Sequence, residues 1–93
     1  MAQADVLERL KINLQIAGTA YDQRLTQIIA AAESFIETEG IDLNLASEGD
    51  MQIVEMYAEW LWRRRDTGDG MPRMLRRIMN NRLFSQKMAV TND

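Results

Sequence analysis

Apolar residues recur at steps of three and four positions along most of the chain, the spacing that places side chains on one side of an α-helix. The clearest run lies between residues 20 and 39 and comprises Tyr21, Leu25, Ile28, Ile29, Ala32, Phe35 and Ile36. A shorter run with the same spacing comprises Val6, Leu7, Leu10 and Leu14. Both patterns predict amphipathic helices that bury one stripe of side chains.

The glycines and the residues able to cap helices divide the chain into four helical segments. Glycine occurs at positions 18, 40, 49, 68 and 70, where breaks between periodic segments are expected. Three segments begin with a capping residue and an acidic residue three positions later (Asp5 with Glu8, Thr19 with Asp22, Ser47 with Asp50), and the fourth begins with Pro72. We therefore predict helices over 5–16, 20–39, 48–66 and 72–84.

The third segment differs from the others because it is apolar on more than one side. Its main stripe comprises Ile53, Val54, Tyr57, Trp60 and Leu61, and Met51, Ala58 and Trp62 lie off that stripe. One interpretation is a central helix surrounded by the other three. The other is that Trp62 and the off-stripe methionines contact another subunit, since aromatic residues and methionine are enriched in interfaces.

These elements predict an all-α fold, a small bundle of about four helices around a central third helix. The 93 residues, 46% of them hydrophobic, suffice for one domain, which we place at residues 1–87. We expect the second and third helices to pack through Ile28, Ile29, Ala32, Phe35, Tyr57 and Trp60, with Phe35 buried. Alternating Ile41, Leu43 and Leu45 suggest a short extended connector, and residues 88–93 are predicted to be a disordered tail.

The composition removes most catalytic chemistry. The chain has no cysteine and no histidine, so disulfides, thiolate nucleophiles, imidazole bases and the usual zinc sites are excluded. Glu33 and Glu37 could share a helix face, but no base that titrates near neutrality accompanies them, and the turn 67–70 lacks the residues of a phosphate or calcium loop. We expect a protein that is not an enzyme, binds no cofactor or metal, and has neither a signal peptide nor a membrane span.

Charge is divided unevenly along the chain. Residues 1–59 carry 3 basic and 11 acidic side chains, whereas residues 60–93 carry 8 basic and 3 acidic ones. Arg63, Arg64 and Arg65 lie where they complement the dipole at the end of the third helix. Arg73, Arg76 and Arg77 share one side of the fourth helix, which is either solvated or available to phosphate or to an acidic protein surface.

Two stretches of the sequence resemble a known family. The first runs from Ala31 to Ile41 and reads AAESFIETEGI, and the second comprises MYAEWLWRRR at residues 56–65 and MPRMLRRIMNNRLF at residues 71–84. Their order resembles that of the small helical head–tail connector proteins of tailed bacteriophages. The similarity extends over roughly residues 5–86 and consists of apolar and basic patterns without a catalytic signature.

The resemblance implies a structural protein that acts in the virion neck and is made in the bacterial cytoplasm. Such proteins form a ring of about twelve copies below the portal, extend the channel through which DNA passes and join the next neck or tail component. In this hypothesis the acidic helices lie nearer the channel, where they repel phosphate so that DNA passes through without specific binding, and the basic fourth helix lies nearer a neighbour or the portal. We expect the subunit or portal interface to comprise Trp62, Arg73, Arg76, Arg77, Met79 and Phe84.

Two other functions remain open at the sequence level. The alternative is a small DNA-binding regulator that uses the basic fourth helix after a turn of suitable length, residues 67–71. Against it, the chain has a net charge of −3, and the fourth helix begins with Pro72, Arg73 and Met74 rather than with residues that commonly read bases. No residue argues for the third possibility, an enzyme subunit or antitoxin-like partner.

Overall fold

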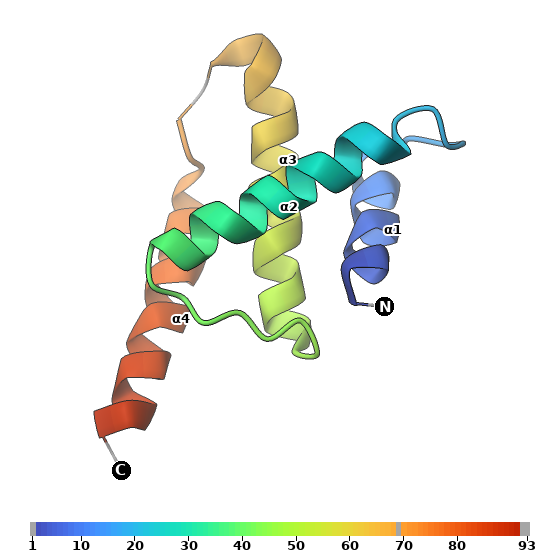
Figure 1. Cartoon of the computed structure of the whole chain (residues 1–93). Helices are drawn as coiled ribbons and strands as arrows, with labels where there is room; N and C mark the ends of the chain where they lie inside the picture. Colours follow the sequence, from blue (N-terminus) through green and yellow to red (C-terminus); the bar gives the residue numbers. More distant parts are fainter. Residues whose placement is uncertain (1, 69, 92–93) are drawn as a thin grey trace.

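The all-α prediction is confirmed. The computed structural model describes residues 2–68 and 70–91, and within these residues the chain forms four α-helices and no strand. The helices are α1 (Ala2–Leu14), α2 (Asp22–Thr38), α3 (Glu48–Thr67) and α4 (Arg73–Thr91) (Figure 1). None of the helices in this part of the chain combines the length and apolar character needed to cross a bilayer.

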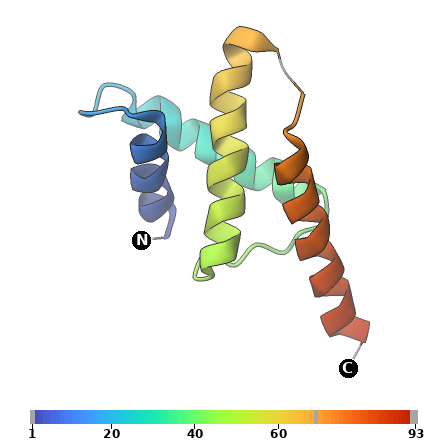
Figure 2. The same cartoon turned by 180° about the vertical axis from the view of Figure 1, so that it is seen from behind.

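Helix α3 is central, as its two apolar sides predict. Helices α1, α3 and α4 lie side by side, and α2 crosses one face of this layer, as the front and rear views show (Figures 1 and 2). Among the described helices, α3 contacts all three others, whereas α4 contacts α3 alone. The two-layer arrangement gives a flat molecule of 47 × 30 × 18 Å.

The core forms where the apolar stripes of the four helices meet around α3. Its buried members are Val6, Leu10, Leu25, Ile29, Ala32, Ile36, Ile41, Ile53, Val54, Tyr57, Ala58, Leu75 and Met79. The predicted contact between the second and third helices is present, but the expected burial of Phe35 is wrong. Phe35 is 51% exposed and stacks on Tyr57 at a ring distance of 6.2 Å, because it lies at the edge of the stripe where no further element covers it.

Several helix ends differ from the prediction. Helix α1 begins at Ala2, so Asp5 lies inside it instead of capping it, and α2 follows Tyr21 without a side-chain capping bond instead of beginning at Thr19. Helix α1 ends at Leu14 rather than near residue 16, because Gln15 adopts a left-handed conformation at φ 58°. The amide of Ile16 then donates to the Lys11 carbonyl and that of Gln15 to the Ile12 carbonyl, a closing pattern usually built on glycine. Helix α4 continues to Thr91 instead of ending near residue 84, so the predicted tail is helical up to Thr91, and residues 92–93 lie outside the described residues.

The predicted start of the third helix is correct, but its expected capping box does not form. Ser47 precedes α3 without a side-chain capping bond. The Asp50 carboxylate instead accepts a hydrogen bond from the backbone amide of Asn44 at 2.8 Å and pairs with Arg82 of α4. Asp50 thus bonds to Asn44 and Arg82 instead of forming the capping box with Ser47.

The connector between α2 and α3 contains no strand, and its alternating apolar residues turn toward the core. Ile41 is buried, and Leu43 and Leu45 are partly buried against the core. Gly40 begins this segment at φ 103°, a conformation that side chains other than glycine rarely adopt. The connector therefore leaves α2 sharply and passes beside α4.

Candidate functional site

Helix α4 buries one side and exposes the other. Leu75 and Met79 are at most 1% exposed, and Ile78 and Leu83 pack partly against the core. The opposite side, which we call the outer face of α4, consists of exposed residues at helical spacing: Arg73, Arg77, Asn80, Asn81, Phe84, Lys87 and Met88. Its amino-terminal half is basic, whereas its carboxyl-terminal half presents Phe84, 66% exposed, and Met88, 45% exposed.

The sequence-predicted interface residues do not all lie on this face. Arg73, Arg77 and Phe84 do, and all three are exposed. Arg76 lies beside them and is also exposed, but it forms an ion pair with Glu39 just after α2, at 2.5 Å. The hydrogen bond that Arg76 donates to Glu39 raises the pKa of the Arg76 guanidinium. Arg76 thus joins α4 to the end of α2.

Two other predicted interface residues occupy different places. Met79 is 1% exposed and belongs to the core, because it lies on the side of α4 that packs on α3. It cannot contribute surface to an interface of the folded chain. Trp62 is half-buried and meets the ring of Tyr21 edge to face at 5.6 Å. It therefore packs against the segment that leads into α2, away from the outer face of α4.

A network of polar contacts, which the sequence patterns did not reveal, holds α4 against the connector. Arg82 donates to both carboxylate oxygens of Asp50 at 2.7 and 3.1 Å and to the Asp42 carbonyl at 2.7 Å. Gln86 accepts from the Asp42 amide at 2.7 Å and donates to the Gly40 carbonyl at 2.9 Å. The signal for this network is the position of Arg82, seven residues after Leu75 on the buried side of α4.

The charges of the network determine the ionisation of its one buried acid. Burial raises the pKa of Asp50, but hydrogen bonds from Arg82 and the Asn44 amide, together with the Arg82 charge, lower it by more. The pKa of Asp50 therefore lies below its ordinary 3.8. The same pair raises the pKa of Arg82, so both partners stay charged and α4 stays fixed relative to α3.

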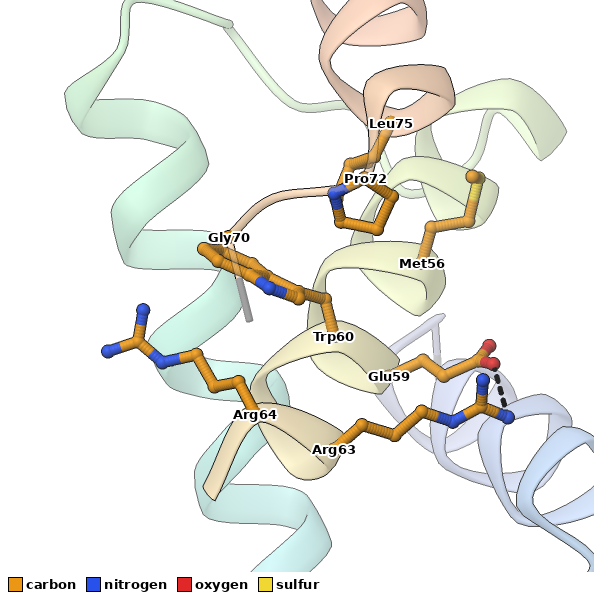
Figure 3. A pocket seen from close by; sticks show the side chains of 8 residues that line it. All are labelled: Met56, Glu59, Trp60, Arg63, Arg64, Gly70, Pro72 and Leu75. Atoms are coloured by element: carbon orange, nitrogen blue, oxygen red, sulfur yellow. Dashed lines mark ion pairs between the residues drawn. The ribbon is translucent and has the colours of Figure 1, made fainter. Parts of the chain in front are cut away.

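A pocket of about 310 Å³ lies between the upper part of α3 and the start of α4 (Figure 3). Its walls are made by Met56, Glu59, Trp60, Arg63, Arg64, Gly70, Pro72 and Leu75. Trp60 packs edge to face on Tyr57 at 5.3 Å, and the Arg64 guanidinium lies 5.1 Å from the Trp60 ring. Arg63 pairs with Glu59 at 2.9 Å, one helical turn earlier. The pocket thus has an apolar wall and a predominantly basic rim.

No group of residues in the described part of the chain could hold a metal ion. Helices α3 and α4 run in opposite directions in both views (Figures 1 and 2), whereas the two helices of a DNA-binding helix-turn-helix cross at about 90–120°. Comparison of the chain with protein-family models, with curated proteins and with solved structures finds no match.

Proposed function

We propose that the chain is a structural subunit of a tailed bacteriophage or prophage that assembles below the portal and joins head to tail. The observation that carries the proposal is the outer face of α4. Arginines at one end and exposed Phe84 and Met88 at the other form a continuous surface that the folded chain leaves uncovered. Exposed apolar residues grouped with arginine are typical of protein interfaces.

The polar network around Arg82 supports an assembly role for this face. Arg82 and Gln86 occupy the opposite side of α4 and tie it to the connector through four backbone or carboxylate partners. Because α4 contacts no helix other than α3 in the described chain, these bonds hold the outer face in one orientation. A pre-ordered surface loses less conformational entropy when it binds.

The charge distribution supports contact with an acidic protein partner rather than tight DNA binding. The chain has a net charge of −3, and its basic residues concentrate in residues 60–93. Arg76 pairs with Glu39, and Arg73, Arg77 and Lys87 are the cationic groups of the outer face. Three cations provide few phosphate contacts, and affinity for DNA should fall steeply with salt.

The experiment mixes the protein with the portal protein of the same phage or prophage and examines the particles by electron microscopy. Wild type should add a ring of density below the portal. The double variant Arg73→Glu, Arg77→Glu and the single variant Phe84→Ala should lose this ring while they keep their helical circular dichroism. Arg24→Glu, an equivalent charge reversal at an exposed position of α2, is the matched control and should assemble normally.

Two results would contradict the proposal. Rings formed equally well by all variants would remove the outer face of α4 from the interface. A fluorescence titration at physiological salt that shows nanomolar affinity for one DNA sequence over random DNA would favour the regulator instead, since specific DNA-binding proteins reach affinities of about 10⁻⁸ M or tighter.

A further inference from the structure

The outward side of α1 combines an exposed apolar residue with two acids. Ile12 is 72% exposed, the highest value among the large hydrophobic residues that the structure describes. Asp5 and Glu8, both exposed, precede it by seven and four positions and therefore share its side of the helix. Val6 and Leu10 occupy the opposite side and are fully buried. The exposed surface is thus an aliphatic side chain in an acidic setting.

Helix α1 holds this surface in a fixed position. Arg9 pairs with Glu55 and with Glu48 of α3 at 2.9 and 2.7 Å, and Lys11 pairs with Asp22 of α2 at 2.8 Å. Asn13 also donates to Glu55. The basic side chains of α1 are therefore directed toward neighbouring helices, and the acids remain on the outward side with Ile12.

The pocket between α3 and α4 has the complementary character. Trp60, Met56 and Leu75 supply apolar surface, and Arg63 and Arg64 lie at its rim (Figure 3). The Arg63 side chain is 63% exposed. A volume of about 310 Å³ is at the lower end of the range for binding pockets, which suits an aliphatic side chain of a partner better than a large ligand.

We infer that this pocket receives α1 of a second copy of the chain, with Ile12 against the Trp60 wall and Asp5 and Glu8 facing Arg63 and Arg64. The inference rests on the proposed function and names the contact between neighbouring subunits. Helices α1 and α4 lie on opposite flanks of α3 in both views (Figures 1 and 2). The pocket and the outward side of α1 are therefore different surfaces of one copy, so the contact is head to tail and repeats from copy to copy.

Charge decides between Ile12 and Phe84, an aromatic residue of similar exposure. Lys87 lies one helical turn from Phe84 and Arg77 lies two turns from it, on the same face of α4. Insertion of Phe84 would bring these cations toward Arg63 and Arg64, and like charges at an interface are strongly unfavourable. Ile12 arrives with acids instead, which leaves the outer face of α4 available to the portal.

The test uses two variants that each lose one surface. The α1 variant carries Glu8→Arg and Ile12→Ser, and the pocket variant carries Arg63→Glu and Arg64→Glu. Neither variant alone should self-associate. When the ¹⁵N-labelled α1 variant, whose pocket is intact, is titrated with the unlabelled pocket variant, whose wild-type α1 is intact, amide signals near Met56, Trp60 and Leu75 should shift and saturate.

Reciprocal labelling and matched variants complete the design. With the label on the pocket variant, the shifts should appear in α1 around Ile12. Met74→Ser, a change at a comparably exposed methionine, should leave self-association as in wild type. Each charge reversal should weaken the contact about tenfold or more. With the label on the pocket variant, addition of the single variant Glu8→Arg should also shift signals around Trp60 of the mutated pocket, because the signs of the two surfaces are then exchanged.

Two outcomes would overturn the inference. One is the absence of shifts in the mixture at about 1 mM of each protein, the weak end of specific affinities. The other is shifts confined to the outer face of α4 in both partners, which would indicate a symmetric contact. If the α1 variant still forms rings on the portal, this contact is wrong and the proposed function stands. If the titration succeeds while wild type forms no ring on the portal, the contact between copies stands and the proposed function is wrong.

Discussion

The pair between Asp50 and Arg82 should contribute a large share of the stability of this fold. The Asp50 side chain is 4% exposed and receives two hydrogen bonds from Arg82 and one from the Asn44 amide. Asp50→Asn keeps the shape of the side chain but removes the charge and one acceptor. Loss of one partner from a fully buried pair costs about 3–5 kcal/mol. The Arg82 side chain is 26% exposed and can regain some water, so we expect a loss of about 2–3 kcal/mol.

A loss of this size is easily measured in a small domain. Total stabilities are about 5–15 kcal/mol, and 1 kcal/mol lowers Tm by about 4–8 °C at this chain length. Asp50→Asn should therefore lower Tm by roughly 10–20 °C near neutral pH, followed by far-ultraviolet circular dichroism. Asp42→Asn is the control, because the hydrogen bonds of Asp42 in the network are made by its backbone. Its exposed side chain acts on Arg82 only through its charge, the smallest of the effects on the Arg82 pKa, so Tm should fall far less than in Asp50→Asn.

The pH dependence provides the decisive comparison. The pKa of Asp50 is lower in the folded chain than its ordinary 3.8, so its stabilisation is present above pH 3.8 and lost as the pH falls through the folded-state pKa. The difference between wild type and Asp50→Asn should therefore shrink in acid. A Tm within the error of wild type near neutrality, or a difference that is equally large in strong acid, would refute the reasoning.

Three further predictions concern the core and its edge. Leu75→Ala should cost about 2–5 kcal/mol in urea unfolding, while Met74→Ala, at the adjacent exposed position, should change stability by less than about 0.5 kcal/mol; equal effects would mean that the side of α4 has been misassigned. Phe35→Ala should lower the free energy of unfolding by only about 1–2 kcal/mol, since the ring is half exposed and the variant loses one stacking contact. A loss near 4 kcal/mol would show that Phe35 is a core residue after all. Burial and the charge of Glu39 raise the pKa of Tyr57 above its ordinary 10.0, so its contribution is complete below pH 10.0 and is lost as the pH rises through the folded-state pKa. Chemical denaturation should show wild type weakening in alkali relative to Tyr57→Phe, and parallel curves would contradict the assignment.

Local signals predicted the helices well and their ends less well. Periodic apolar residues and glycines located all four segments, because both signals depend on neighbours within one or two helical turns. The end of α1 escaped prediction because Gln15 takes the left-handed position that glycine usually occupies. The end of α4 escaped because residues 85–91 continue the helix past Leu83 and Phe84, beyond the last residues of the predicted helical pattern.

The candidate site was predicted only in part. Helical spacing placed Arg73, Arg76 and Arg77 on one side of the fourth helix, and the structure leaves all three exposed. Helical spacing could not show that Met79 is in the core. A residue of a helix becomes buried only when another element packs on its side. Nor could helical spacing show that Arg76 pairs with Glu39, a residue 37 positions away.

The sequence by itself determined an all-α chain with a central third helix, an acidic amino-terminal part and a basic carboxyl-terminal part, because these properties follow from residue type and local spacing. The tertiary structure decided which charged side chains form ion pairs within the chain. It paired Arg82 with Asp50 and Arg9 with Glu55 across 32 and 46 positions, and it set α1 and α4 on opposite flanks of α3. Partners so distant along the chain meet only when helices pack, and that packing determines which acidic and basic surfaces remain for other molecules.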